Sequence, residues 1–360
     1  MLPGFGIGER NLIQKDVLGK LGIVGMLPED LAPHMLAMGH PRFRAAQILE
    51  WIYSKKAVDY SAMTNIPLEL RSLLSERAPL AAPETVDTRR AEDGTVKLLL
   101  GYEDGNAAET VLMRHDYGLS LCVSSQAGCK MGCTFCASAI GGFSRDLTAG
   151  EMCWQFLKAA GVAGEERISS VVLMGMGEPL LNYDNVMKFI RVLNWNKGFN
   201  VGARHITVST CGIVPGIDRL AGEDLQITLS VSLHAPDDAT RDRIMPVNKM
   251  YGVNEVVAAA KRYAQRTGRR ITYEYVMIKG VNDSPSQAAS LAGLLRGSLA
   301  HVNLIPLNPV RESGLSRPAE KAVADFRGVL EAAGISVTSR REMGSEIDGA
   351  CGQLRLRHRA

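Results

Sequence analysis

The segment CKMGCTFC carries three thiols, at Cys129, Cys133 and Cys136. Three is an odd number, and the spacings are too short for a framework of disulfides, so metal binding is the first interpretation of this cluster. Two kinds of centre use clustered cysteines. Zinc in a structural site takes four ligands in a tetrahedron, whereas an iron–sulfur cubane held by three thiolates keeps its fourth iron open for a further ligand.

The rest of the chain supplies no second cysteine pair. The other cysteines stand singly, at Cys122, Cys153, Cys211 and Cys351. The nearest upstream histidine, His115, precedes Cys129 by fourteen residues. A zinc knuckle therefore remains only the weaker alternative, and the CxxxCxxC spacing resembles that of the radical S-adenosylmethionine (SAM) superfamily.

Strand-like and helix-like segments alternate from residue 118 onward. The apolar runs are LSLCVSS, SSVVLMG, HITVST, QITLSVSL, ITYEYVM, HVNLIPL and a final ISVTSRR. Alternating β and α units form parallel sheets with right-handed crossovers. Six units and a seventh strand predict an α/β fold, a partial (β/α)6 TIM-like barrel, with a doubly wound sheet as the alternative.

Two regions precede the predicted barrel. Residues 1–85 have helical periodicity, and Phe43, Ile48, Trp51 and Ile52 are predicted on one side of a helix. Residues 86–114 contain two Asp-Gly turns around VKLLLGY, which is typical of a small β-meander. We therefore predict a helical accessory domain over 1–85, a meander over 86–114, a radical SAM barrel over 115–345, and a C-terminal loop with a basic tail over 346–360.

Small and polar residues follow the predicted strands. They are Gly175, Gly177 and Glu178, then Ser209 and Thr210, Ser232 and His234, and Asn308. In parallel α/β barrels the chemistry gathers at the C-terminal ends of the strands. Each residue alone could be a turn former or a core residue. Together they suit SAM, because glycines allow close approach to a cofactor and the Glu178 carboxylate can accept hydrogen bonds from the methionine ammonium.

Composition limits the class of protein. The chain has 360 residues and a formal net charge of +3, so any contact with nucleic acid would use local basic patches. The first residues lack a basic segment followed by an apolar run, and no apolar stretch reaches membrane-spanning length. These features predict a cytoplasmic protein with reduced cysteines and no membrane association.

Longer segments identify a family. They are GHPRFRAAQILEWIY, LCVSSQAGCKMGCTFCAS, LMGMGEPLLN, TVSTCGIVPGIDRLA, SVSLHAPDDATRDRIMPVNK, YEYVMIKGVND, NLIPLNP and IDGACGQL. Together they resemble the RlmN/Cfr family of radical SAM RNA adenine methyltransferases, and the resemblance covers nearly the whole chain.

The resemblance implies roles for individual residues. Cys129, Cys133 and Cys136 would bind a [4Fe–4S] cluster. The implied SAM contacts are Gly177, Glu178, Ser209, Ser232, Leu233, His234 and Asn308. The implied catalytic residues are Glu109, the base that removes a ring proton, Cys351, the methyl-carrying cysteine, and Cys122, the second reactive thiol. Two SAM molecules would be used in each turnover.

The implied reaction avoids a chemical obstacle. C2 and C8 of adenine are electron-poor carbons without a nucleophilic lone pair, whereas a thiolate accepts a methyl group readily. One SAM would methylate Cys351, and a second, cleaved by an electron from the cluster, would give the 5′-deoxyadenosyl radical that abstracts hydrogen from the S-methyl group. The methylene radical would add to the base and Glu109 would take the ring proton. Cys122 would then attack Cys351, releasing methylated RNA and leaving a disulfide.

The resemblance also implies substrates and partners. PLL after Glu178 is more similar to the RlmN branch, which methylates C2, than to the Cfr branch, which methylates C8 and confers antibiotic resistance and remains the alternative. The implied substrates are 23S ribosomal RNA at the peptidyl-transferase centre and tRNA at the adenosine beside the anticodon. Flavodoxin or ferredoxin would donate electrons to a monomeric enzyme. The candidate RNA contacts are Arg42, Arg44, Trp51, Lys55, Lys56 and the tail RLRHRA. A metal-stabilised RNA-binding module without catalysis is the alternative of a different class.

Overall fold

The computed structural model describes residues 22–308, 313–339, 347 and 353–359. The chain divides into two compact units. The first takes residues 1–84, 148–166 and 184–202, and the second takes 85–147, 167–183 and 203–360. None of the described helices is long and apolar enough to span a membrane.

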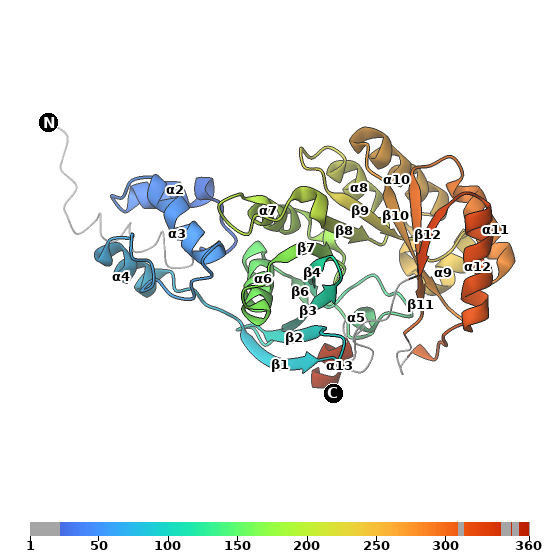
Figure 1. Ribbon diagram of the computed structural model, residues 1–360, viewed down its shortest axis with the longest axis horizontal. Coiled ribbons are helices and arrows are strands. Elements are labelled where there is room, and N and C mark those ends of the chain that lie inside the picture. Colours follow the sequence, from blue (N-terminus) through green and yellow to red (C-terminus); the bar gives the residue numbers. More distant parts are fainter. Residues whose placement is uncertain (1–21, 309–312, 340–346, 348–352, 360) are drawn as a thin grey trace. The chain divides into compact units, whose positions relative to one another are not determined.

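The first unit is helical (Figure 1). Its helices are α2 (Pro28–Ala37), α3 (Phe43–Tyr53), α4 (Leu68–Arg77), α6 (Ala149–Ala163) and all but the first residue of α7 (Tyr183–Asn194). Tyr53 is buried in this unit, where its ring contacts those of Trp195 and Phe199 at centroid distances of 6.2 and 4.9 Å. Helices α6 and α7, which fall within the predicted barrel region of the sequence, thus pack with the N-terminal helices.

The second unit is built on a ten-stranded sheet in the order β1-β2-β3-β4-β7-β8-β9-β10-β11-β12. Its strands are β1 (Glu84–Arg90), β2 (Val96–Gly101), β3 (Ala107–His115), β4 (Gly118–Cys122), β7 (Ile168–Leu173), β8 (Ile206–Thr210), β9 (Thr228–Ser232), β10 (Ile271–Met277), β11 (Ala300–Pro306) and β12 (Ser336–Ser339). From β4 to β12 each neighbouring pair is parallel. Spatial order follows sequence order without reversal, which favours the predicted partial barrel over a doubly wound sheet.

The predicted meander extends the same sheet. Strand β2 pairs antiparallel with β3, and β3 pairs antiparallel with β4, the first strand of the barrel. In this register Leu99 lies opposite Glu109 and Lys97 opposite Val111. Lys97 and Glu109 are therefore diagonal neighbours on one face of the sheet.

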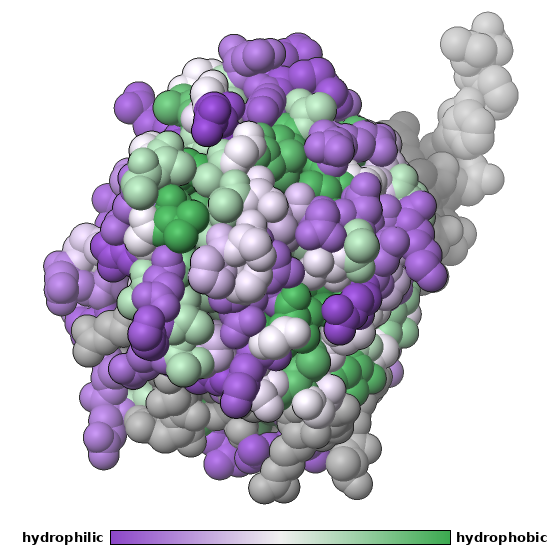
Figure 2. All heavy atoms as spheres, turned by 90° about the vertical axis from the view of Figure 1, so that its right-hand side faces the viewer, coloured by the Kyte–Doolittle hydropathy of each residue, from purple (hydrophilic) through white to green (hydrophobic). Residues whose placement is uncertain are grey.

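Further helices belong to the second unit. They are α5 (Ala137–Ile140), α8 (Val214–Leu220), α9 (Asp238–Ile244), α10 (Val253–Thr267), α11 (Pro285–Leu295), α12 (Glu320–Ala332) and α13 (Gln353–Arg359), with 3-10 turns η1 (Pro179–Leu181), η2 (Ala203–His205) and η3 (Pro246–Lys249). Figure 1 shows α11 and α12 beside β11 and β12. Helix α12 buries Phe326 and Leu330, and the face of the molecule that carries this helix is largely hydrophilic (Figure 2).

Candidate active site

The three predicted cluster ligands lie in one loop between β5 (Gln126–Ala127) and α5. Pairing of β5 with β6 (Arg145–Asp146) closes the base of this loop. Gly128 is the tightest point, because it has φ of +88° and a β-carbon there would lie 1.7 Å from the carbonyl oxygen of Gly142. Only glycine fits where the two arms of the loop approach so closely.

The thiols of Cys129, Cys133 and Cys136 are partly buried and interact electrostatically with one another. Burial raises the pKa of Cys129 to about 12, so a bound metal must displace the thiol proton. In the described part of the chain, no three His, Cys, Asp or Glu side chains are grouped as ligands for a metal ion. A cubane does not need its thiolates to converge on one ion, because each binds a different iron. The donor set of three thiols fits such a cluster with one iron open.

The glycines after β7 have a structural reason. A β-carbon on Gly175 would lie 2.6 Å from the Ser124 hydroxyl, and one on Gly177 would lie 2.5 Å from the Gln126 side chain. Both glycines therefore allow the end of β7 to pack against the segment that follows β4. The need for glycine here arises from packing inside the protein and does not depend on a cofactor.

Glu178 links the ends of two strands. Its buried carboxylate accepts hydrogen bonds from the Leu180 amide at 3.0 Å and from the Cys211 amide, just beyond β8, at 2.7 Å. Burial raises the pKa of this carboxyl group, and the hydrogen bonds from Cys211 and Leu180 oppose that shift. The side chains of Cys211 and Thr210 also hydrogen-bond to this carboxylate.

The other predicted SAM contacts lie at the ends of neighbouring parallel strands. Ser209 is the second-last residue of β8, and Ser232 is the last residue of β9. Leu233 is fully buried directly after β9, and Asn308 is partly buried two residues beyond β11. The structure thus brings the predicted residues of β7, β8, β9 and β11 to one edge of the sheet.

His234 is a buried, neutral histidine. Its backbone is left-handed, with φ of +59°, and its Nδ1 accepts a hydrogen bond from the Val276 amide at 2.9 Å. The acceptor role of Nδ1 places the proton on Nε2. The edge of the Phe135 ring, from the cysteine loop, meets the imidazole at a centroid distance of 5.0 Å. Burial, together with the Arg241 charge, lowers the pKa of His234 to about 3, so this side chain positions neighbours and is not an acid–base group near neutral pH.

The buried imidazole should make stability depend on pH. The unfolded chain binds a proton at His234 near pH 6.5, but the folded protein does so only near pH 3, so stability is complete above pH 6.5 and falls as the pH decreases. We expect a loss of about 1.4 kcal/mol per pH unit from this group, measured by urea unfolding of the metal-free protein at pH 7, 6 and 5.

Two substitutions isolate this effect. Asparagine keeps an acceptor near the Nδ1 position and tolerates the left-handed backbone, so His234→Asn should fold and show a shallower pH dependence than the wild type. The exposed His205 gives the matched control, and His205→Asn should keep the wild-type dependence. If stability depended on pH equally in the wild type and in His234→Asn, the buried neutral imidazole of His234 would not be the cause of the dependence.

The Glu109 carboxylate is held by two other segments of the chain, β2 and α13. It is 3% exposed, and its carboxylate lies 2.9 Å from the ammonium of Lys97, which is 0% exposed. Its other oxygen accepts a hydrogen bond from the Arg355 amide of α13 at 2.7 Å. The Arg355 guanidinium in turn donates to Ser144 at 3.2 Å, beside the cysteine loop. The predicted base is thus linked to the C-terminal helix, and that helix to the cysteine loop.

Cys122 is a buried cysteine on β4. It lies opposite Val111 of β3 and packs with Val111 and Met113 in a small apolar cluster. Because side chains two residues apart share a face of a strand, Cys122 and Glu109 belong to the same face of the sheet. Cys351, the predicted methyl carrier, lies outside the described residues, and the described chain resumes at Gln353.

Two residues of this region are missing from the sequence predictions, Lys97 and Arg241, whereas Arg355 is predicted only as part of the basic tail RLRHRA for RNA. Lys97 had a detectable signal, since a single lysine stands in the otherwise apolar strand VKLLLG. Arg241 is 0% exposed on the short helix α9, and no local pattern distinguishes it from the exposed Arg243 two residues later. Cys211, which the sequence left without a role, lies buried at the end of β8 with its amide bonded to Glu178.

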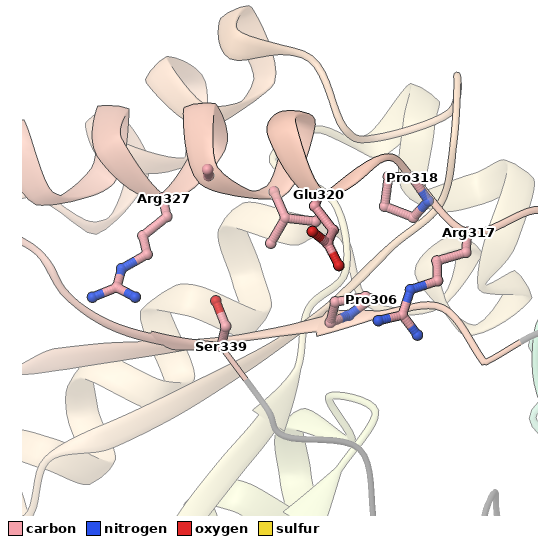
Figure 3. A pocket seen from close by; sticks show the side chains of 8 residues that line it. Pro306, Arg317, Pro318, Glu320, Arg327 and Ser339 are labelled. Atoms are coloured by element: carbon pink, nitrogen blue, oxygen red, sulfur yellow. The ribbon is translucent and has the colours of Figure 1, made fainter. Parts of the chain in front are cut away.

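A separate pocket of about 200 Å³ lies where β11 and β12 end beneath α12 (Figure 3). Its lining includes Pro306, Ser339, Arg317, Glu320 and Arg327. Arg327 is engaged with Glu331 at 2.6 Å. None of the predicted site residues lines this pocket, so we assign it no part in catalysis.

Comparison with known proteins decides the family. Residues 21–80 match the ribosomal RNA large subunit methyltransferase N-terminal domain, and residues 123–292 match the radical SAM superfamily. The probable dual-specificity RNA methyltransferase RlmN of Symbiobacterium thermophilum is 51% identical over 343 residues, which cover 94% of this chain and 92% of the relative. The chain belongs to the RlmN family of radical SAM RNA methyltransferases.

Further relatives agree with membership of the RlmN family. The corresponding protein of Geobacillus thermodenitrificans is 46% identical, with 98% of this chain and 97% of the relative covered. The crystal structure of a radical SAM methyltransferase from Sphaerobacter thermophilus matches with a TM-score of 0.89 at 46% identity, over 92% of this chain and 98% of that chain. The predicted resemblance and fold are confirmed, and RlmN-family membership implies a [4Fe–4S] cluster, SAM and an RNA substrate. Membership of this family of methyltransferases excludes the alternative hypothesis of an RNA-binding module without catalysis.

Proposed function

We propose that this enzyme methylates C2 of a specific adenosine in 23S ribosomal RNA at the peptidyl-transferase centre, and of the adenosine beside the anticodon in some tRNAs. The observation that carries the proposal is the arrangement of the second unit, where the three-thiol loop follows β4 and the edge rich in small and polar residues is formed by the next strands. Relatives that are 51% and 46% identical bear the name of dual-specificity RNA methyltransferases, which supports two classes of RNA substrate.

The cofactors would bind at the carboxyl ends of the parallel strands. Cys129, Cys133 and Cys136 would hold the cluster through three irons. The residues that would contact SAM are Gly177, Glu178, Ser209, Ser232, Leu233, His234 and Asn308. When bound, the cluster and SAM supply an electron and a radical that can remove hydrogen from a methyl group. The fixed peptides around Glu178 and His234 would orient the methionine and adenosine parts of SAM.

The protein's own groups would carry the rest of the reaction. The Cys351 sulfur would accept a methyl group from SAM. The carbon of this methyl group would then form the new bond to C2 of the adenine. Glu109 would remove the proton from C2, with the Lys97 ammonium at 2.9 Å holding its carboxylate in place. The Cys122 thiolate would attack the Cys351 sulfur and break its bond to the carbon. The electron pair of that bond would stay on the carbon, which takes up a proton to become the new methyl group, so that methylated RNA leaves and a Cys122–Cys351 disulfide remains.

Helix α3 offers stacked cations and aromatic rings for RNA. The Lys55 ammonium lies 3.6 Å from the centroid of the Trp51 ring, and the Arg44 guanidinium lies 5.0 Å from that of Phe43, which is 56% exposed. Such pairs suit phosphates and unstacked bases. Lys56 and Arg44 differ from Lys55, because each donates to a backbone carbonyl within the protein. The Lys56 ammonium donates to the carbonyl oxygen of Gly164 at 3.0 Å, and the Arg44 guanidinium donates to that of Asn65 at 2.8 Å. We propose Phe43, Trp51 and Lys55 as RNA contacts.

The nucleoside product tests the proposal. We expect reconstituted enzyme, supplied with SAM and reduced flavodoxin or ferredoxin, to form 2-methyladenosine in 23S ribosomal RNA fragments and in tRNA. Digested nucleosides are measured by mass spectrometry against 2-methyl and 8-methyl standards, which share a mass but separate by chromatography. Cys136→Ala, which lacks one cluster ligand, is the control and should give no product. A predominance of 8-methyladenosine would instead assign the Cfr-type reaction.

A further inference from the structure

Arg241 on α9 is the most completely buried cation beside the strand ends. It is 0% exposed. Burying a charge costs several kcal/mol unless hydrogen bonds replace its water shell. The Arg241 guanidinium therefore needs hydrogen bonds to the surrounding protein in place of its water shell.

All five N–H groups of the guanidinium donate hydrogen bonds. The acceptors are the carbonyl oxygens of Leu233 (3.0 Å), Cys211 (2.6 Å), Ser232 (3.2 Å) and Tyr251 (3.2 Å), and the side-chain oxygen of Asn248 (3.1 Å). All five acceptors are neutral oxygens. The nearby acidic residues Asp238 and Asp242 act on the charge electrostatically. A lysine has only three donors on one nitrogen and cannot reproduce this planar fork.

The bonded carbonyl groups belong to the strand ends of the proposed SAM site. Cys211 directly follows β8, Ser232 ends β9, and Leu233 comes next. The peptides on both sides of Cys211 are fixed, since its amide donates to Glu178 at 2.7 Å and its carbonyl accepts from Arg241 at 2.6 Å. Arg241 therefore sets the orientation of the two peptides between Ser232 and His234.

The same helix also holds the cysteine loop. The Thr134 amide donates to the carbonyl oxygen of Ile244, the last residue of α9, at 3.0 Å. The Arg241 charge and the Cys133 thiol interact electrostatically. One short helix thus connects the loop that would carry the cluster with the strand ends that would bind SAM.

We propose that Arg241 is a positioning residue of this enzyme, whose guanidinium fixes the SAM-binding strand ends and whose positive charge raises the reduction potential of the cluster. The inference rests on the proposed cofactor site. The Arg241 side chain makes two separate contributions. Its hydrogen-bonding fork orients the peptides. Its charge acts on the cluster, because the reduction potential of a cluster depends on nearby charge.

Two substitutions separate the fork from the charge. Arg241→Lys keeps the charge but loses the fork, and Arg241→Met loses both. Each holoenzyme is reconstituted, its SAM dissociation constant is measured by equilibrium binding, and its midpoint potential is measured by a redox titration followed by electron paramagnetic resonance. We expect SAM affinity to fall about tenfold or more in both variants, because buried carbonyl groups lose their donors. The midpoint potential should stay at the wild-type value in Arg241→Lys and fall in Arg241→Met.

Arg243→Met is the matched control, because Arg243 is exposed on the same helix and it should change neither quantity. If neither Arg241 variant folds by circular dichroism, Asn248→Ala replaces them. It removes one acceptor and leaves the charge, so it should weaken SAM binding a few-fold without changing the potential.

Wild-type SAM affinity and potential in the folded variants, or unchanged SAM affinity in Asn248→Ala, would overturn the inference. A wild-type protein that binds neither cluster nor SAM would contradict the proposed function as well, so the two failures are distinguishable.

Discussion

Replacing Lys97 with methionine should lower the free energy of unfolding by about 3–5 kcal/mol. The Lys97 ammonium and the Glu109 carboxylate lie 2.9 Å apart, with side-chain exposures of 0% and 3%. Without the ammonium, the carboxylate stays buried and its desolvation is no longer offset by the opposite charge. The measurement is urea unfolding of the metal-free protein at pH 8, followed by far-ultraviolet circular dichroism.

Two further variants test the cause of this loss. An apolar pair can replace a buried ion pair at little cost, so Lys97→Met combined with Glu109→Leu should recover most of the stability. The exposed pair of Lys321 and Asp325, with side-chain exposures of 84% and 50%, is the matched control. Lys321→Met should cost less than about 1 kcal/mol. Similar losses for Lys97→Met and Lys321→Met would show that burial of this pair does not matter.

The parallel part of the fold was predictable because burial on both faces leaves a continuous apolar run in the sequence. Every predicted run from LSLCVSS to ISVTSRR contains one strand of the sheet, β4 and β7 to β12. The short strands β5 and β6 were not predicted. They span two residues each and exist because the loop arms meet at Gly128 and Gly142, a contact that no local pattern encodes.

One helical prediction is wrong for a geometric reason. The helical periodicity predicts Phe43 on one side of a helix with Ile48 and Ile52, yet Phe43 is 56% exposed while both isoleucines are buried. At 3.6 residues per turn, Phe43 lies about 140° around the helix from Ile48, so it cannot share the buried stripe. Its exposure makes it available for stacking with RNA instead.

The residue types of the candidate site were predictable from the sequence, but the residues that contact and position them were not. The sequence places the candidate site at the strand ends, because parallel strands bring their carboxyl ends to one edge. The need for glycine at 175 and 177 comes from contacts with Ser124 and Gln126, about fifty residues earlier in the chain. Buried charges such as Lys97 and Arg241 depend on partners supplied by other segments, so sequence alone shows a cation without its acceptors.

Cys351→Ala and Cys122→Ala should both abolish RNA methylation but fail at different steps. Without the Cys351 sulfur there is no methyl acceptor, so neither methylated protein nor covalent RNA should appear. Without Cys122 the acceptor remains, so the bond between protein and adenine should form and then persist, because no second thiol attacks the Cys351 sulfur. Gel electrophoresis should therefore show a slow-migrating species only in Cys122→Ala, and ribonuclease should collapse it.

A buried cysteine elsewhere controls for damage to packing. Cys153 on α6 is 0% exposed, and Cys153→Ala should methylate RNA without accumulating the covalent species. Cys122 packs with Val111 and Met113 in a buried apolar cluster. Wild-type turnover in Cys122→Ala, with no trapped RNA, would show that Cys122 is a core residue. Accumulation of the trapped species would show that its thiol breaks the bond between protein and RNA.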